Sequence, residues 1–221
     1  PSERKDLAAG QPDKLKATFT EVLKGGFDVA MVILDTPTPP KMKPDAWAVT
    51  AFLLRENGLR NPNSLFKKPL SMEEYLSAKP IADPLRLFDC VMPCAGAEAF
   101  LVMSEARARD LGLPFATVRG AIERHNAFSD DPVMERGGWR VDRDELYAMA
   151  ETTPADIDFV QAYDDYPVIV MIQFEDLGFC EKGEGPAFVR AHRMTHDGSF
   201  PANTSGGQLS FGQAGAAGGF M

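Results

Sequence analysis

The amino-acid sequence predicts an α/β protein built of packed layers, and three observations support this prediction. The 221 residues are 44% apolar and 25% charged, an ordinary composition for a globular protein with a sizeable core. Residues 13–23 have the periodicity of an amphipathic helix, and residues 27–34 then form a continuous apolar run of buried-strand length. Residues 97–103 provide another such run, ahead of another predicted helix. Helices that alternate with buried strands are typical of layered α/β folds.

Composition also limits the classes of partner and the cellular compartment that we expect for this protein. There are 23 basic and 32 acidic residues, and the net charge of −9 disfavours broad binding to nucleic acid while leaving room for a local phosphate pocket. No apolar run approaches the roughly 20 residues that span a bilayer, and the N-terminal residues lack the apolar core of a signal peptide. Three cysteines are too few for a disulfide framework, and Cys90 and Cys94 lack further metal ligands. We expect a cytoplasmic protein that binds neither nucleic acid, membrane nor metal.

Local signals place the other elements. Ser71 and Asp142 each stand three residues ahead of a glutamate, the spacing of a capping box, and Ser104 can cap a third helix. Prolines and polar residues indicate loops over residues 35–44 and 61–84. A further strand is predicted over residues 115–122. The predicted helices cover residues 46–56, 72–78, 105–111, 142–150 and, as a helix or an extended segment, 187–194.

The chain is organised around residues 160–185. An acidic turn there consists of Tyr163, Asp164, Asp165 and Tyr166. Pro167 suits the first turn of a helix, and either aspartate can cap the free backbone donors that follow it. The apolar residues 168–174 can be a helix or a buried strand, because periodicity alone does not separate the two, and Gly178 is suited to end a helix. Two phenols and two carboxylates on one tight turn predict a functional site.

Each of these features also has a purely structural explanation. Tyr163 and Tyr166 can be core aromatics, and the aspartates can be simple helix caps. The glycine-rich residues 206–219 have neither a Walker A lysine nor a dinucleotide fingerprint, so they form either a tightly packed turn or a set of backbone N–H donors for a ligand oxygen. No Gly-x-Ser-x-Gly elbow is present, and no cysteine begins a helix beside a histidine. The three histidines, His125, His192 and His196, are expected at the surface.

Several segments together resemble the thiolase superfamily, and within it the sterol-carrier and lipid-transfer branch. The resembling segments are residues 81–90, 95–112, 163–164, 175–185 and 203–207, and the match extends over residues 61–221. The resemblance implies a layered αβαβα fold. It divides the chain into an N-terminal half, residues 1–113, with a loop excursion near 35–84, and a truncated C-terminal half, residues 114–221. Some strands of such a fold have no counterpart here, so we expect the fold to be incomplete over these residues.

The departures from the family point to a particular reaction. The segment that carries the thiolase nucleophilic cysteine has no counterpart, and the family's Gly-His-Pro is replaced by Gly212, Gln213 and Ala214. A subgroup of similar proteins has also lost the cysteine and cleaves steroid side-chain CoA thioesters by a retro-aldol reaction. Membership of that subgroup implies an acyl-CoA substrate, no cofactor beyond its CoA, a homodimer formed through the thiolase-like core, and a DUF35-type OB-fold partner.

These considerations assign roles to the candidate site. Tyr163 is the proposed base for the β-hydroxyl proton, assisted by a neighbouring donor or cation because an ordinary phenol, with a pKa near 10, is hardly ionised at neutral pH. Tyr166 relays hydrogen bonds, and Gln213 donates its amide to the enolate. The predicted donors of an oxyanion hole are Asn203, Ser205, Gly206 and Gly207. Two alternatives stay open: an acyltransferase whose cysteine lies in a segment not seen here, and a non-catalytic thiolase-like subunit.

Overall fold

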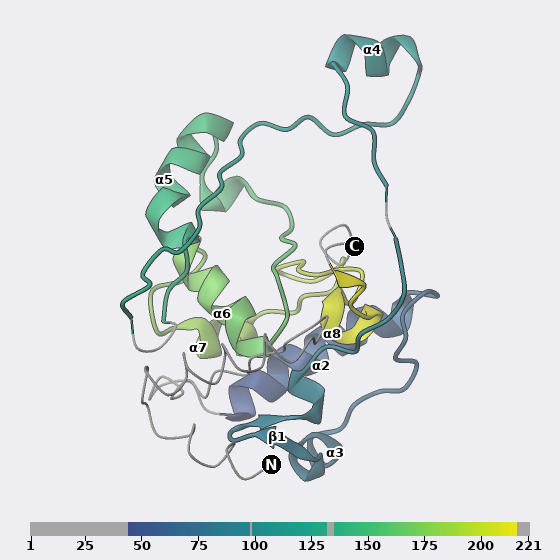
Figure 1. Ribbon diagram of the computed structural model, residues 1–221, viewed down its shortest axis with the longest axis vertical. Helices are drawn as coiled ribbons and strands as arrows, with labels where there is room; N and C mark the ends of the chain where they lie inside the picture. Colours follow the sequence, from purple (N-terminus) through teal and green to yellow (C-terminus); the bar gives the residue numbers. More distant parts are fainter. Residues whose placement is uncertain (1–43, 98, 132–134, 216–221) are drawn as a thin grey trace, which may run out of the picture. The chain divides into compact units, whose positions relative to one another are not determined.

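A computed structural model describes residues 44–97, 99–131 and 135–215 (Figure 1). The helix predicted at residues 13–23 and the strand predicted at residues 27–34 lie outside these residues. No helix in the described part of the chain has the length and apolarity to cross a membrane.

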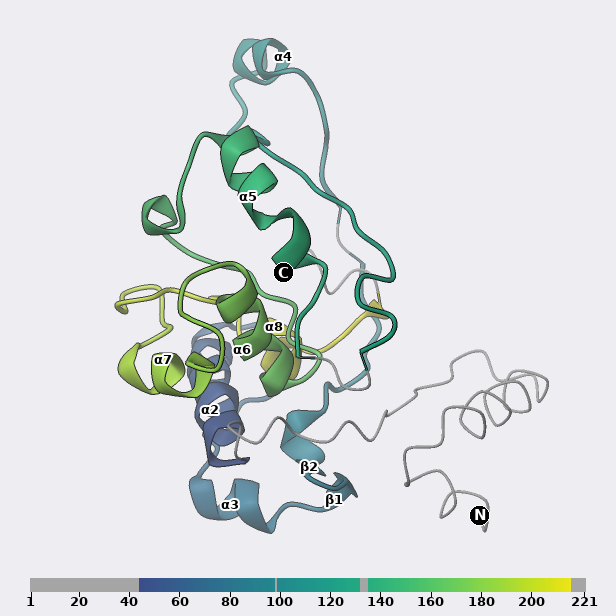
Figure 2. The ribbon, with the colours of Figure 1, turned by 90° about the vertical axis from the view of Figure 1, so that its left-hand side faces the viewer.

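Four helices pack together and form the core. They are α2 (Pro44–Arg60), α6 (Pro167–Asp176), α7 (Gly185–Ala191) and α8 (Gly207–Phe211). Both ribbon views show α2 lying beside α6 and α8, although more than 100 residues separate them in sequence (Figures 1 and 2). The largest fully buried apolar side chains of this cluster are Leu54, Val170, Met171, Ile172, Phe174, Val189 and Met194.

Helix α2 confirms the helix predicted at residues 46–56 but continues through Asn57 and Gly58 to Arg60. Asparagine was expected to help end the helix. Instead, the buried Asn57 side-chain amide donates to the carbonyl oxygens of Met194, Ala202 and Asn203, at 3.0, 2.9 and 3.1 Å. The side chain therefore joins α2 to the facing loop, whose Met194 and Asn203 carbonyls also accept from the N–H groups of Ala202 and Gly206.

Helix α6 resolves the ambiguity of residues 168–174 in favour of a helix. Pro167 begins it, as predicted, and it ends just before Gly178, whose φ of +85° suits glycine. The helix is buried along most of its length, which explains why its apolar residues show no clear helical period. Phe174 packs edge-to-face on Phe188 of α7 and on Phe200, with ring centroids 5.8 and 5.2 Å apart.

The serine caps are confirmed, and one aspartate cap is wrong. Helices α3 (Met72–Ser77) and α4 (Glu105–Asp110) begin after Ser71 and Ser104, whose hydroxyls accept from the backbone N–H groups three residues on. Helix α5 (Trp139–Ala150) begins earlier than predicted, so Asp142 lies inside it. Its carboxylate pairs instead with the Arg124 guanidinium through bonds of 2.5 and 2.6 Å.

The strands predicted at residues 97–103 and 115–122 are wrong. The described residues form one two-stranded antiparallel sheet, β1 (Pro80–Ala82) with β2 (Leu85–Arg86), and short 3-10 turns follow at Leu87–Asp89 and Pro154–Asp156. The two apolar segments instead run outward on either side of α4, away from α2 and α8 (Figures 1 and 2). Leu101, Val102 and Val118 are each more than 80% exposed. Apolar sequence alone does not make a strand when no neighbouring strand pairs with it.

Asp164 turns inward and holds helix α8. Its carboxylate is 1% exposed and accepts hydrogen bonds from the backbone N–H groups of Gln208 and Leu209, at 2.8 and 3.1 Å. Gly207, with φ of +60°, makes room for it, because a Cβ there would lie 2.0 Å from an Asp164 oxygen. The prediction that Asp164 or Asp165 caps the helix after Pro167 is therefore wrong, since no side chain caps α6.

The buried Asp164 predicts an unusual dependence of stability on pH. Burial raises the pKa of Asp164 to about 6, although the hydrogen bonds that its carboxylate accepts lower that pKa. A carboxyl whose pKa is higher in the folded than in the unfolded state favours folding at low pH, and this contribution is lost as pH rises through 6. We therefore compare the unfolding free energy of the wild type with that of Asp164→Asn. The difference, wild type minus variant, should fall by about 2 kcal/mol between pH 4 and pH 7.

Chemical denaturation across this pH range checks the prediction. The exposed Asp158, changed to Asn, is the matched control, and its difference from wild type should stay flat. A difference for Asp164→Asn that is independent of pH, or that grows with pH, contradicts it.

Removal of the Asn57 side-chain amide is expected to destabilise the fold. Asn57→Ala leaves three buried carbonyl oxygens without that donor, and we expect the free energy of unfolding to fall by about 1–3 kcal/mol. Asn63→Ala, at an exposed position six residues after Asn57, is the control. Equal denaturation midpoints for the two variants would show that the Asn57 bonds do not stabilise the fold.

Candidate active site

The backbone of Tyr163 is fixed by a glutamine from α6. The buried Gln173 side chain accepts from the Tyr163 N–H at 2.9 Å and donates to the Tyr163 carbonyl at 2.6 Å. A primary amide can make this pair of bonds because it carries one acceptor and two donors, in the same way as a neighbouring strand. The Tyr163 side chain is 47% exposed, so its hydroxyl is accessible from solvent.

Asp165 lies between two of the residues that the sequence singled out. Its carboxylate accepts a hydrogen bond from Gln213 Nε2, at 3.2 Å, and its charge raises the pKa of Tyr163, two residues before it on the same turn. The backbone of Gln213 is itself fixed, because its N–H donates to the Met92 carbonyl at 2.9 Å and its carbonyl accepts from the Cys94 N–H at 2.8 Å. The structure thus joins Gln213 to the turn that carries Tyr163, through a carboxylate that sequence reasoning treated as a helix cap.

This environment disfavours charge on the phenols. Burial, followed by the charge of Asp165, raises the pKa of Tyr163 above the ordinary value for tyrosine. Burial and the same charge raise the pKa of Tyr166 to about 12. Burial also raises the pKa of Asp165, and the hydrogen bond from Gln213 opposes this effect. At neutral pH both phenols are therefore protonated.

The four predicted donors of an oxyanion hole shape the glycine turn. The Asn203 side chain is buried and bonds to the backbone N–H and carbonyl of Ala162, at 2.7 and 2.9 Å. The N–H of Gly206 donates to the Asn203 carbonyl, and the N–H of Gly207 donates to the Ser205 hydroxyl. A Cβ on Gly206 would lie 2.5 Å from the Gly58 Cα, so this turn is tightly packed. Binding of an oxyanion by these residues stays a prediction.

The cysteines and histidines, all of which the structure describes, form no nucleophile–base pair. Burial raises the pKa of Cys90 to about 11 and that of Cys180 to about 12, so both thiols are protonated. The histidines instead contact non-cysteine side chains: His125 contacts Glu123, His192 contacts Ser199 and Phe188, and His196 contacts Arg60. Across the described ranges, no group of three His, Cys, Asp or Glu side chains could hold a metal ion.

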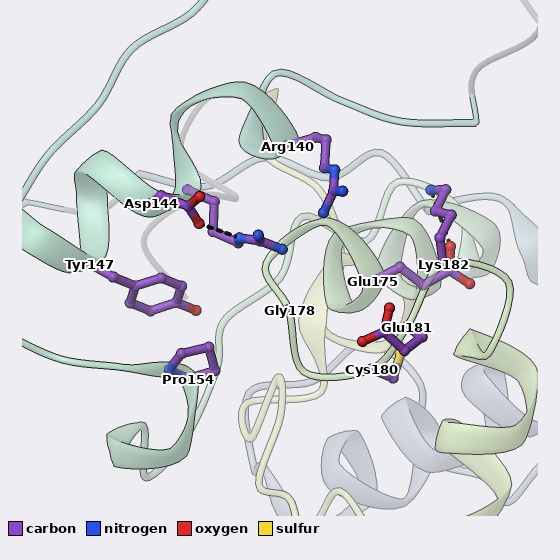
Figure 3. Close-up of a pocket in the computed structure, with 10 residues that line it drawn as sticks. Arg140, Asp144, Tyr147, Pro154, Glu175, Gly178, Cys180, Glu181 and Lys182 are labelled. Atoms are coloured by element: carbon purple, nitrogen blue, oxygen red, sulfur yellow. Dashed lines mark hydrogen bonds and ion pairs between the residues drawn. The ribbon is translucent and has the colours of Figure 1, made fainter.

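A polar cavity of about 340 Å³ lies elsewhere, between α5 and the C-terminal end of α6 (Figure 3). The Arg140 side chain points from α5 toward the segment around Glu175 and Gly178. Carboxylates pair with two of the cations that line the cavity: Lys182 pairs with Glu175 at 3.1 Å, and Arg143 pairs with Asp144 at 2.9 Å. The lining includes neither Tyr163 nor Asp165 nor Gln213, so the cavity is separate from the candidate site.

Known proteins resemble this chain in sequence and in fold. A family model described as thiolase C-terminal domain-like matches residues 120–221. The 17-hydroxy-3-oxo-4-pregnene-20-carboxyl-CoA lyase of Mycobacterium tuberculosis is 35% identical over 166 residues, which are 70% of this chain and 42% of the lyase. The steroid side-chain-cleaving aldolase of Thermomonospora curvata is 33% identical over 168 residues, with the same two coverages. The solved Ltp2-ChsH2(DUF35) aldolase has a TM-score of 0.68 at 23% identity, over 95% of this chain and 54% of that one.

The chain thus spans less than half the length of the two curated relatives that it matches. The likeness in fold confirms the expected thiolase-like α/β fold, although residues 99–103 and 115–122 do not form the strands predicted for it. The division into halves at residues 113 and 114 stays a prediction. Taken together, the family match and the relatives show that residues 120–221 are thiolase C-terminal domain-like and that the chain resembles steroid-cleaving members of that group.

Proposed function

We propose that this chain carries the proton-transfer residues of a carbon–carbon lyase that cleaves a 3-hydroxyacyl-CoA by a retro-aldol reaction. One observation carries the proposal: the Gln213 amide is hydrogen-bonded to Asp165, on the same acidic turn as the half-exposed Tyr163, in a thiolase-like fold and at the turn where the sequence predicted the site. The curated relatives support it, because the names of both state cleavage of steroid substrates.

The chemistry requires three events at the substrate. The β-hydroxyl loses its proton, the bond between the α and β carbons breaks, and the electron pair of that bond passes to the thioester as an enolate. A carbonyl product leaves, and the enolate then takes a proton at its α carbon to give the shorter acyl-CoA. Tyr163 offers an accessible phenol for the first step, and the Gln213 amide offers an N–H group for the enolate oxygen.

The protonation state of Tyr163 constrains its role. Because its pKa is raised by burial and by Asp165, a free tyrosinate is scarce at neutral pH. The phenol can accept the β-hydroxyl proton when its own proton departs in the same step. Tyr166, whose pKa is raised to about 12, stays a neutral hydrogen-bonding group beside it.

The proposal extends to the substrate and the partners. The relatives' names support a steroid side-chain CoA thioester, and the name of the solved aldolase supports a DUF35-type OB-fold partner. We propose no cofactor apart from the CoA of the substrate. A homodimer through the thiolase-like core and a cytoplasmic location follow from the resemblance and from the composition.

The activity is tested with the purified protein, assayed with and without a DUF35-type OB-fold protein. A panel of 3-hydroxyacyl-CoA thioesters, including a steroid side-chain thioester, should yield a ketone or aldehyde together with a shorter CoA ester. A panel that yields no cleavage product in either condition contradicts the proposal. A covalent acyl-cysteine detected by intact mass would instead support an acyltransferase.

Tyr163→Phe removes the accepting oxygen while keeping the ring, and we expect the cleavage rate to fall by about 10²–10⁴-fold. Tyr147→Phe is the matched control, since the Tyr147 hydroxyl donates to the Leu177 carbonyl at 3.0 Å and lies outside the site. Full activity in a folded Tyr163→Phe protein would exclude Tyr163 from the reaction.

A further inference from the structure

We infer that Gln173 is a positioning residue, which fixes the backbone of Tyr163 and thereby sets the place from which the phenol takes part in the cleavage. The inference deepens the proposed function and rests on it. Gln173 lies in α6 and is buried, so it acts on the reaction through another residue. That residue is Tyr163, whose side chain is half-exposed.

The segment that carries Tyr163 is bonded along both of its edges. In an extended chain, the backbone polar groups of successive residues point to opposite edges. On one edge, the Val160 carbonyl accepts from the Asn203 N–H at 2.9 Å, and the Ala162 N–H donates to the Asn203 side-chain oxygen at 2.7 Å. On the other edge, the Tyr163 N–H donates to Gln173 Oε1 at 2.9 Å, and the Tyr163 carbonyl accepts from Gln173 Nε2 at 2.6 Å. A side-chain amide thus takes the place of a pairing strand.

The Gln173 amide is itself held by the helix from which it extends. Its Nε2 also donates to the Ile169 carbonyl, four residues earlier in α6, at 3.1 Å. The oxygen and both N–H groups of the amide are therefore in use, which gives the side chain one defined orientation. Helix α6 packs against α2, α5 and α7. The amide consequently fixes Tyr163 relative to the core of the protein.

This fixation matters for the reaction because of how Tyr163 is placed. The two hydrogen bonds fix the direction of its Cα–Cβ bond, and only the side-chain torsions then decide where the hydroxyl lies. The side chain is 47% exposed, so packing restrains it less than it would restrain a buried ring. A displacement of about 1 Å, even from a mutation outside the reacting groups, can cost about 10²-fold in rate. We therefore expect Gln173 to affect kcat as well as stability.

Gln173→Met tests the inference by kinetics, since it keeps the length of the side chain and removes both bonds to Tyr163. In the protein that cleaves a panel substrate, we expect kcat to fall by about 10²-fold and KM to change little. Val189→Ala is the control, because it destabilises the core from α7, where Val189 is fully buried, and should keep wild-type kcat. Wild-type kcat in Gln173→Met, or an equal loss in Val189→Ala, overturns the inference.

Gln173→Glu gives a readout that a loss of packing would not move. The introduced carboxyl can accept from the Tyr163 N–H and donate to the Tyr163 carbonyl when it is protonated, but it has no donor when it is ionised. Burial raises the pKa of such a carboxyl, so the protonated form is favoured as pH falls. The kcat of this variant, divided by that of the wild type, should be larger at pH 5.5 than at pH 8.5. The corresponding ratio for Gln173→Met should be the same at both pH values.

The other titratable groups near Gln173 are common to all three proteins, so their effects on kcat cancel in these ratios. They are Tyr163, Asp164, Asp165 and Tyr166 of the turn before α6, and Glu175 and Asp176 near its C-terminal end. A ratio for Gln173→Glu that does not change with pH overturns the inference.

Amide hydrogen exchange measures the positioning without turnover. The Tyr163 N–H should be protected in the wild type and lose its protection in Gln173→Met, while the Ala162 N–H, which donates to Asn203, should stay protected in both. Equal protection of Tyr163 in the two proteins overturns the inference. A wild type that cleaves no panel substrate but shows this difference in exchange contradicts the proposed function alone, since Gln173 then still holds Tyr163 in place.

Discussion

The arrangement of the site depends on one buried carboxylate. Asp164 reaches across 44 positions of sequence to Gln208 and accepts from two successive backbone N–H groups at the start of α8. These donors have no partner inside the helix, so the carboxylate satisfies them. Its negative charge also interacts favourably with the positive, N-terminal end of the helix dipole. Burial raises the pKa of Asp164 to about 6, which shows that its negative charge is held at an energetic disadvantage.

That contact brings two distant segments together. The turn before α6 carries Tyr163 and Asp165, and the segment after α8 carries Gln213. With Asp164 attached to α8, the Asp165 carboxylate can meet the Gln213 amide at the turn that carries Tyr163. The proposed function relies on proton transfer by these side chains. In the described structure the thiols of Cys90 and Cys180 are protonated, and the contacts of the three histidines are with other side chains. The same fold can host such different chemistries because function resides in the site.

Sequence alone could predict features whose causes are local. Ser71 and Ser104 cap helices through donors three residues away, and Pro167 and Gly178 mark the ends of α6 by their own backbone preferences. Tyr163 and Gln213 were identified from composition and resemblance. The role of Asp165 was missed because its partners include Gln213, 48 residues away.

The errors share the same physical origin. A helix cap and a strand are both completed by partners, and periodicity does not reveal a partner that is distant in sequence. Residues 99–103 and 115–122 have apolar sequences suited to strands, but Leu101 and Val118 lie exposed with no neighbouring strand beside them. Asn57 was expected near a helix end, but it continues the helix because its amide serves the loop at residues 194–203.

The attachment of α8 by Asp164 is tested most directly by amide hydrogen exchange of the native protein, followed residue by residue by NMR. We expect the N–H groups of Gln208 and Leu209 to exchange far more slowly than those of the exposed Leu101 and Val102, and we expect this protection to be lost in Asp164→Ala. Exchange at Gln208 and Leu209 as fast as at Leu101 in the wild type would show that the carboxylate does not hold the helix, and would contradict the arrangement of Tyr163, Asp165 and Gln213 described above.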